Sequence, residues 1–183
     1  YFMKKKIIYL TRISLILIMF ISFHDTAMCQ DMTSSKIIEL PQGSKLVLDS
    51  TINITDSISV KIINGICTML PSVQKLIPLD NVTINLGINS QYVLPVWGVG
   101  GRTIRDDNGE RVDFYYDPKH PNFKVEYIIR SLVHEFHHVC RFRMPDFQIS
   151  LLEGMISEGL ADHFMIEVLH CEITPFSSSL TEE

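Results

Sequence analysis

The chain has 183 residues, 46% hydrophobic and 20% charged, which suits one domain with its own core and excludes a largely disordered protein. Its formal net charge is −5, and it becomes −8 when residues 1–29, with four basic residues and one acidic residue, are set aside. A chain this acidic, with no basic stripe, argues against nucleic acid as a partner.

Residues 1–29 have the pattern of a secretory signal peptide. Lys4 to Lys6 and Arg12 form a positive start, Ile13 to Phe23 form an apolar core, and Ala27-Met28-Cys29 resembles a cleavage site. We therefore expect cleavage after Cys29, export to the periplasm or the medium, and a single folded domain at residues 30–183. Two alternatives remain open: the segment stays as a membrane anchor, or Cys29 carries a lipid. After removal of the leader, no stable membrane insertion is expected.

Residues 30–88 predict the first part of the core. An entry segment over residues 30–55 includes a short alternating piece, Lys45 to Leu48, that suits a strand. Residues 56–77 predict a helix, which Asp56 or Ser57 caps and Pro71 breaks or kinks. Residues 81–88 alternate between polar and apolar side chains and predict a second strand.

A hairpin follows, in which residues 93–104 and 111–116 pair across the turn signal Asn108-Gly109. The first arm contains glycines at positions 98, 100 and 101. Glycines let another backbone approach closely, so we expect residues 99–103 to border a cleft, with Gly100 and Gly101 contacting a substrate peptide. The competing interpretation, glycines that serve only the local turn, is about as strong.

Residues 134–138 read His-Glu-Phe-His-His, which contains the zinc-binding pattern H-E-x-x-H. On a helix, His134 and His138 lie one above the other and can bind one metal ion, while Glu135 lies beside them as a general base. We expect this helix to run from a cap at Asn122 to about Phe142. Its apolar residues fill a separate arc that suits burial: Ile128, Ile129, Leu132, Val133, Phe136, Val139 and Cys140.

A second helix is predicted from about Phe147 to Leu169. It is apolar almost all the way round, which predicts that it is buried. A carboxylate buried there is costly unless it is paired or bound to metal, so Glu158 is the expected third ligand in a His₂Glu zinc site. Asp162 follows on the same face, where it can accept a hydrogen bond from a ligand histidine.

These motifs resemble those of the gluzincin metalloproteases, the group that contains thermolysin. More narrowly, three pieces are similar to a bacterial family of predicted zinc-dependent proteases, described as a domain of unknown function. They are residues 117–123, residues 134–138 and residues 157–161. The resemblance implies an α+β, zincin-like fold: a small twisted mixed sheet packed on the His134 helix and on the second, Glu158-bearing helix.

The expected function is a zinc-dependent peptidase that cleaves peptides or proteins through a metal-activated water, with Zn²⁺ on His134, His138 and Glu158. Gluzincins usually add an oxyanion-stabilising residue, often from a C-terminal subdomain, whereas only 25 residues follow Glu158 here. The candidates for that residue stay unranked: Tyr92, Arg102, His120 and His163. The alternative class is a non-catalytic, zinc-stabilised exported binding module.

Other residues near the motif leave smaller questions open. His137 is expected to line the cleft or support the ligands, with a His134–His137 pair as a lesser alternative. Three cysteines remain after the leader, and a Cys140–Cys171 disulfide would join the two metal-bearing helices, although spacing cannot decide it.

Overall fold

The computed structural model describes residues 36–145 and 150–172, so the predicted leader lies outside the described residues. Within them the fold is a mixed α+β arrangement, a five-stranded sheet with three α-helices and one short 3₁₀ helix. The α+β class is therefore confirmed. The elements in chain order are β1 (Lys36–Glu39), η1 (Pro41–Gly43), β2 (Lys45–Leu48), α2 (Ser57–Val73), β3 (Thr83–Ile88), β4 (Val99–Asp106), β5 (Gly109–Tyr116), α3 (Val125–Phe142) and α4 (Leu151–Leu169).

The sheet has the order β1-β2-β3-β5-β4. Strands β2, β3 and β5 run parallel to one another, whereas β1 and β4 pair antiparallel at the two edges. The predicted hairpin is confirmed: Asp106 pairs with Gly109, and Gly109 adopts a φ of 108° that favours glycine. As a result β4, with its glycines, is an edge strand.

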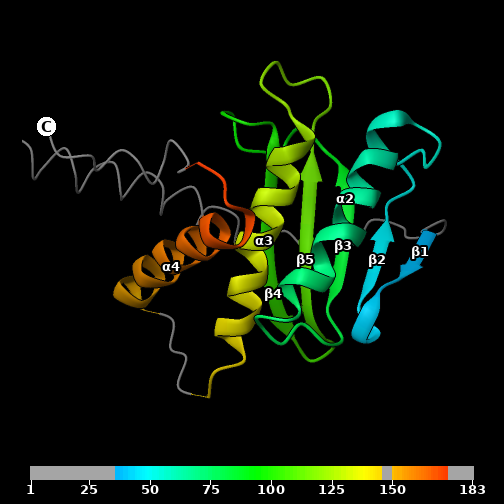
Figure 1. The fold of residues 1–183 in the computed structure, drawn as a ribbon. Helices are drawn as coiled ribbons and strands as arrows, with labels where there is room; N and C mark the ends of the chain where they lie inside the picture. The colour runs from blue at the N-terminus through cyan, green and yellow to red at the C-terminus, as the bar shows by residue number, and fades with distance from the viewer. Residues whose placement is uncertain (1–35, 146–149, 173–183) are drawn as a thin grey trace, which may run out of the picture. The chain divides into compact units, whose positions relative to one another are not determined.

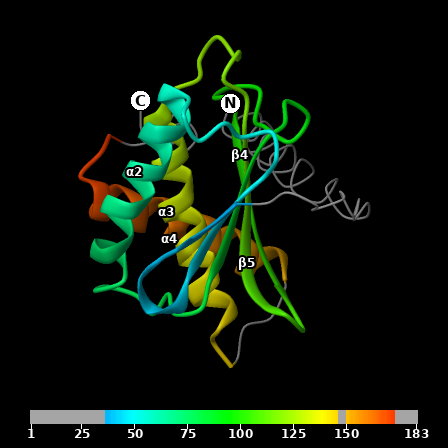
Figure 2. The ribbon, with the colours of Figure 1, turned by 90° about the vertical axis from the view of Figure 1, so that its right-hand side faces the viewer.

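One face of the sheet is covered by α2 and α3, which lie side by side (Figures 1 and 2). Helix α4 packs against α3, on the side away from α2 (Figure 1). Residues from β2 to β5, α2 and α3 form one continuous apolar core, to which α4 adds Met165. The predicted apolar arc of α3 supplies its share, with Ile128, Leu132, Val133, Phe136 and Val139 all buried.

Helix α2 begins where the sequence predicts and ends earlier. The Asp56 carboxylate accepts hydrogen bonds from the N–H groups of Ile58 and Ser59, which confirms the cap. Of the two alternatives at Pro71, a break or a kink, the break is wrong, because the helix continues to Val73. Pro71 lies in the last turn, where its missing N–H removes a single helical hydrogen bond.

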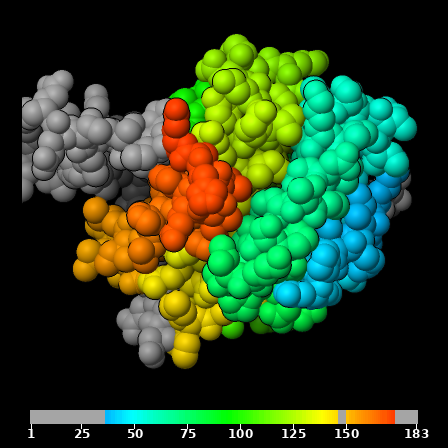
Figure 3. All heavy atoms as spheres, in the orientation of Figure 1, coloured from blue at the N-terminus to red at the C-terminus, as the bar shows by residue number. Residues whose placement is uncertain are grey.

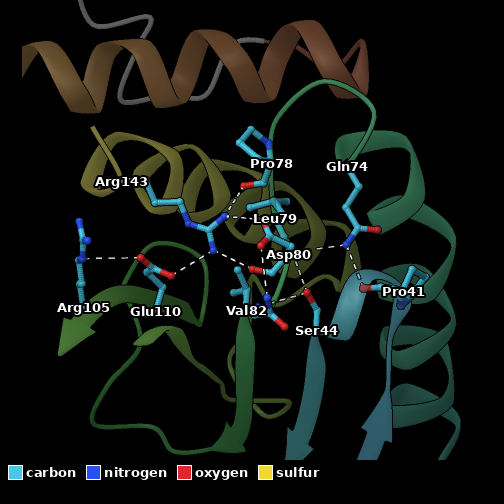
Figure 4. Close-up of polar contacts among 11 residues, drawn as sticks. Pro41, Ser44, Gln74, Pro78, Leu79, Asp80, Val82, Arg105, Glu110 and Arg143 are labelled. Carbon is cyan, nitrogen blue, oxygen red and sulfur yellow. Dashed lines mark hydrogen bonds and ion pairs between the residues drawn. The ribbon is translucent and has the colours of Figure 1, made fainter. Parts of the chain in front are cut away.

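Helix α3 starts later than predicted. Its N-cap is Lys124, and Asn122 instead donates a hydrogen bond to the carbonyl of Val96. Its end at Phe142 is confirmed, and the next residue, Arg143, anchors it (Figure 4). The Arg143 guanidinium donates to the carbonyls of Pro78 and Asp80 and to the Glu110 carboxylate. These bonds hold the end of α3 against the loop that enters β3 and against β5.

Helix α4 differs from its prediction in burial. It is capped by Ser150, whose hydroxyl accepts from the N–H of Glu153, and only Ser157, Ala161 and Met165 are buried. The expectation of a buried helix is wrong because α4 packs along one side only and lies at the surface (orange to red in Figure 3), with five of its large apolar side chains exposed. They are Leu151, Leu152, Met155, Ile156 and Leu160.

Two further sequence questions receive an answer from the described residues. Cys67, Cys140 and Cys171 are all free thiols, so the Cys140–Cys171 disulfide is not formed. Over residues 36–145 and 150–172, no helix has the length and apolar character needed to cross a membrane.

Candidate metal centre

The side chains of His134, His138 and Glu158 converge between α3 and α4, and each offers one ligand atom to a shared point. Nε2 of His134 lies 3.1 Å from Nε2 of His138 and 3.2 Å from Oε2 of Glu158. Nε2 of His138 lies 3.3 Å from Oε1 of Glu158. The two residues from one helix and the one from the next therefore meet as the sequence suggests.

This donor set fits a zinc ion. Zinc–nitrogen and zinc–oxygen bonds of about 2.0–2.1 Å at tetrahedral angles place neighbouring donor atoms roughly 3.3 Å apart. The observed separations of 3.1 to 3.3 Å match that spacing. Two imidazole nitrogens that face each other beside a carboxylate are poorly matched without a cation, because two lone pairs and a negative charge then meet.

Both imidazoles are oriented by a hydrogen bond at the other ring nitrogen. Nδ1 of His134 donates to Oδ1 of Asp162 at 2.9 Å, the arrangement expected from the sequence. Nδ1 of His138 lies 3.1 Å from the Ser157 hydroxyl. The ionised Asp162 carboxylate can only accept, so it places the hydrogen of His134 on Nδ1, and the Ser157 hydroxyl can accept the Nδ1 hydrogen of His138 in the same way. Nε2 of each ring is then the atom that can bind metal.

Ser157 is a residue for which the sequence analysis gave no role. The available signal was its position directly before Glu158 in a helix that is otherwise mostly apolar. The structure buries it, with 4% of its surface exposed, and a buried hydroxyl needs a partner. Here the partner is the ring of His138.

Hydrogen bonds between ionisable side chains join α3 to α4 at this site, and they change the pKa values of the groups involved. Burial alone would lower the pKa of His134, but hydrogen bonds to Asp162 and Glu158 outweigh it and raise that pKa to about 10. Burial would raise the pKa of Glu158, but hydrogen bonds from His134 and His138 hold it well below its usual value. At neutral pH and without metal, the His134 ring is therefore protonated and paired with the carboxylates of Asp162 and Glu158.

Glu135 is buried on α3 and faces β4. Its Oε2 accepts a hydrogen bond of 2.8 Å from the Thr103 hydroxyl, and its charge contributes to the raised pKa of His134. A Cβ on Gly101 would lie only 2.9 Å from Cγ of Glu135. The sequence analysis missed Thr103, because its role depends on how β4 is placed against α3, which no local pattern reveals.

The two glycines that were predicted to contact substrate have local neighbours. A Cβ on Gly100 would lie 2.2 Å from the carbonyl oxygen of Tyr92, and one on Gly101 would lie 2.6 Å from the ring of Phe114. Both positions therefore need glycine for close packing. That Gly100 and Gly101 also border a bound peptide stays a prediction.

His137 points away from the three ligand atoms. Its ring lies against Phe164, and its Nδ1 is buried with no hydrogen-bond partner among the described residues. Burial lowers the pKa of His137 to about 4. The metal-ligand group that the described residues form contains His138 and not His137, so the lesser alternative of a His134–His137 pair is not favoured.

The four unranked oxyanion candidates each have another neighbour. The ring of Tyr92 lies beside Tyr115, Arg102 forms an ion pair with Asp113, and His163 lies exposed near Glu167. Nε2 of His120 bonds the carbonyl of Pro95, and its Nδ1 accepts from the N–H of Asn122. The loop at residues 117–123 thus holds the segment that leads into β4.

Two imidazoles and a carboxylate, each imidazole supported by a further side chain, define this protein as a candidate metalloprotein with a mixed α+β fold. Residues 106–183 match the family described as "Predicted Zn-dependent protease (DUF2268)". The matched region contains α3 and α4, and the match confirms the narrower resemblance, to a family of predicted zinc-dependent proteases. No match was found among curated proteins or among solved structures.

Proposed function

We propose that the protein is a zinc-dependent peptidase of the gluzincin type, with a zincin-like fold, that hydrolyses peptide bonds in peptides or proteins. The observation that carries this proposal is the convergence of His134, His138 and Glu158, in which the two histidine Nε2 atoms lie 3.1 Å apart and each lies 3.2 to 3.3 Å from one of the two Glu158 oxygens. A buried carboxylate, Glu135, follows directly after the first of these residues. The family match supports a zinc-dependent protease in general.

His134, His138 and Glu158 would hold the zinc, while Asp162 and Ser157 keep the two imidazoles in the ligating tautomer. When bound, zinc supplies Lewis acidity, which polarises a peptide carbonyl and makes a water molecule easier to deprotonate. The Glu135 carboxylate accepts that proton and later delivers it to the leaving amine, so that the carboxylate is restored. Because Oε2 is bonded to Thr103, Oε1 is the oxygen that takes the proton.

The ligand count supports an enzyme over a zinc-stabilised binding module. Structural zinc sites fill all four positions with protein ligands, whereas catalytic sites use three and leave one for water or substrate. The described part of the chain brings together three ligands, two histidines and one glutamate. A buried glutamate beside the first ligand has no purpose in a purely structural site.

The test is metal analysis combined with peptide hydrolysis for the wild type and Glu135→Gln. We expect about one zinc per chain in both, and a loss of turnover of about 10²- to 10⁴-fold in the variant, which is the usual contribution of a general base. Glu126→Gln, on the exposed first turn of the same helix, is the matched control and should stay active. A wild type that binds zinc but hydrolyses no member of a broad peptide library would establish the module instead.

We also propose that the enzyme acts outside the cytoplasm, on the pattern of residues 1–29. Expression of the full chain in a secreting bacterial host should yield a mature protein that begins at Gln30. N-terminal sequencing measures this directly. A product that retains the leader in the membrane fraction would favour the anchored form.

A further inference from the structure

The Glu135 side chain lies against the inner face of the edge strand β4. Residues 101 and 103 are two positions apart, so both face the same side of that strand. At position 101 there is no side chain, and a Cβ there would reach Cγ of Glu135 at 2.9 Å. At position 103 the threonine hydroxyl lies 2.8 Å from Oε2 of the same glutamate. Glycine leaves room for the carboxylate, and threonine holds it.

We propose that Thr103 is a positioning residue that fixes the orientation of the Glu135 carboxylate for proton transfer, in a space that Gly101 keeps open. This inference rests on the proposed function, because it concerns the glutamate that the proposal makes the general base.

The geometry explains why a hydroxyl is needed at this point. A glutamate side chain has three rotatable bonds, and helix α3 fixes only where it begins. The Thr103 hydroxyl lies within reach of Oε2 at 2.8 Å and of the main-chain carbonyl of Glu135 at 3.0 Å. It therefore lies between the two ends of one residue and limits the rotation of the side chain. With Oε2 held, Oε1 has a defined direction.

The strand that carries Thr103 is itself held in place. Thr103 pairs with Val112 of β5, which is buried, and Arg105 on the same strand donates a hydrogen bond to the carbonyl of Phe142 at the end of α3. Strand β4 is thus attached to α3 by Arg105 as well as by the Thr103 hydroxyl. A carboxylate held by a fixed strand can be placed more accurately than one held by a loop.

A purely structural role would also place a hydroxyl between β4 and α3. The two roles differ in whether the effect of removing the Thr103 hydroxyl depends on the Glu135 carboxylate. If Thr103 only joins the strand to the helix, its bond to the main-chain carbonyl is sufficient, and the identity of residue 135 does not matter. If Thr103 positions Glu135, the effect of removing the hydroxyl disappears when the carboxylate is already absent.

The first arm of the test compares Thr103→Val, which keeps the shape and removes the hydroxyl, with Thr103→Ser, which restores it. Zinc content, kcat and KM are measured for both and for the wild type. We expect Thr103→Val to keep its zinc and its KM within about twofold and to lose about 10- to 100-fold in kcat, since misplacement by about 1 Å can cost 10²-fold. Thr103→Ser should recover most of that loss. Thr83→Val, a threonine on β3, is the control and should match the wild type.

The second arm needs neither zinc nor substrate. Thermal unfolding of the zinc-free protein is measured for Thr103→Val, Glu135→Met and the double variant. Removing the hydroxyl should lower Tm when Glu135 is present, because a buried carboxylate loses its donor. In the Glu135→Met background, the same change should lower Tm by less than half as much. Equal shifts in both backgrounds would overturn the positioning role and leave a structural one.

The arms separate the two proposals. A wild type that turns over peptides, with a Thr103→Val variant of unchanged kcat, overturns this inference and leaves the proposed function standing. A wild type without any hydrolysis overturns the proposed function, and with it the catalytic role of Thr103. A loss of kcat in Thr103→Val that Thr103→Ser restores, joined to a background-dependent change in Tm, supports both.

Discussion

Helix α3 lies beside α2 on one face of the sheet and buries five large apolar side chains. Its last turn is followed by Arg143, which bonds two carbonyls and two carboxylates. Helix α4 buries only Ser157, Ala161 and Met165, and its Leu152 side is 67% exposed. Yet each helix supplies part of one candidate metal centre. His134 and His138 come from the firmly packed element, and Glu158 comes from the loosely packed one.

The two helices differ in how far their positions depend on the candidate metal centre. The His138 side chain is 10% exposed on α3, whereas the Glu158 side chain is 41% exposed on α4. Helix α4 is attached to α3 through the bonds from His134 to Asp162 and Glu158, the bond from His138 to Ser157, and an ion pair between Arg141 and Glu153. Together with the contact between His138 and Glu158, four of these five polar attachments involve the two candidate ligand histidines.

The largest expected effect is therefore that of metal removal on α4. Chelation should increase amide hydrogen exchange along α4 by at least about tenfold while α3 changes little, because local opening follows local packing. Zinc should also raise Tm, since free zinc at 1,000 times its Kd stabilises the folded state by about 4 kcal/mol. Exchange measured by mass spectrometry with and without chelator tests this. Equal changes in both helices would mean that α4 is held independently of the metal.

Two leucine substitutions compare the packing of α3 with that of α4 at positions outside the metal site. Leu132 on α3 is 1% exposed, and Leu132→Ala should lower the free energy of unfolding by about 2–5 kcal/mol, the usual cost of a core leucine. Leu152→Ala on the open side of α4 should change it by no more than about 0.5 kcal/mol. Denaturant titration of the two variants provides the comparison. A large loss for Leu152→Ala would show that this side of α4 is covered.

The same contrast explains what could be read from the sequence. The amphipathic pattern of α3 predicted its buried face, and the turn signal at Asn108-Gly109 predicted the β4–β5 hairpin, because both are local rules of periodicity and backbone geometry. The burial of α4 was predicted wrongly because an apolar composition does not say which neighbours exist. A start for α3 at Asn122 was wrong because Asn122 has a tertiary partner, the carbonyl of Val96.

Within the site, the residues selected by their spacing in the sequence could be predicted, whereas those that meet only through tertiary packing could not. Spacing along a helix was enough to select His134, His138 and Asp162. Glu158 was selected on the argument that α4 is buried, and that premise is wrong, because the Glu158 side chain is 41% exposed. Thr103 lies 32 residues from Glu135 in the chain and meets it only through the placement of β4 on α3. Ser157 lies next to a predicted ligand, but its partner His138 is 19 residues away. No periodicity in the chain encodes either pair.

Ser157→Ala should weaken zinc binding on the α4 side of the site. Without the hydroxyl, Nδ1 of His138 loses its acceptor, and the loss of such a supporting group typically costs about 10- to 100-fold in metal affinity. Competition with a chromogenic chelator measures the constant. Ser72→Ala, an exposed serine near the end of α2, is the control and should leave the affinity unchanged. An unchanged affinity in Ser157→Ala would show that the His138 ring is oriented by its packing alone.

Zinc binding should release about one proton from His134 at pH 7. In the zinc-free protein the pKa of His134 is raised to about 10, so the ring is charged at pH 7 and zinc must displace its proton. The Glu158 carboxylate, whose pKa is lowered, is already ionised and releases none. Between about pH 6.5 and 8.5 the apparent affinity should therefore rise about tenfold per pH unit. Calorimetry in buffers of different ionisation enthalpy counts the proton, and Asp162→Asn, which lowers the pKa of His134, should reduce the count.

The smallest effect is expected at the ion pair that joins the helices outside the metal site. Arg141 and Glu153 are both mostly buried at their side chains, and Glu153→Gln should lower the free energy of unfolding by about 1 kcal/mol, at the upper end for a partly exposed pair. Glu167→Gln, on the same helix, is the matched control, because its contact with His163 is solvent-exposed on both sides and should be worth nothing measurable. The difference should grow when zinc is removed, since α4 then loses its link through the metal and depends more on its direct contacts with α3. A Glu153→Gln effect that is the same with and without zinc would show that metal and ion pair hold the helix independently.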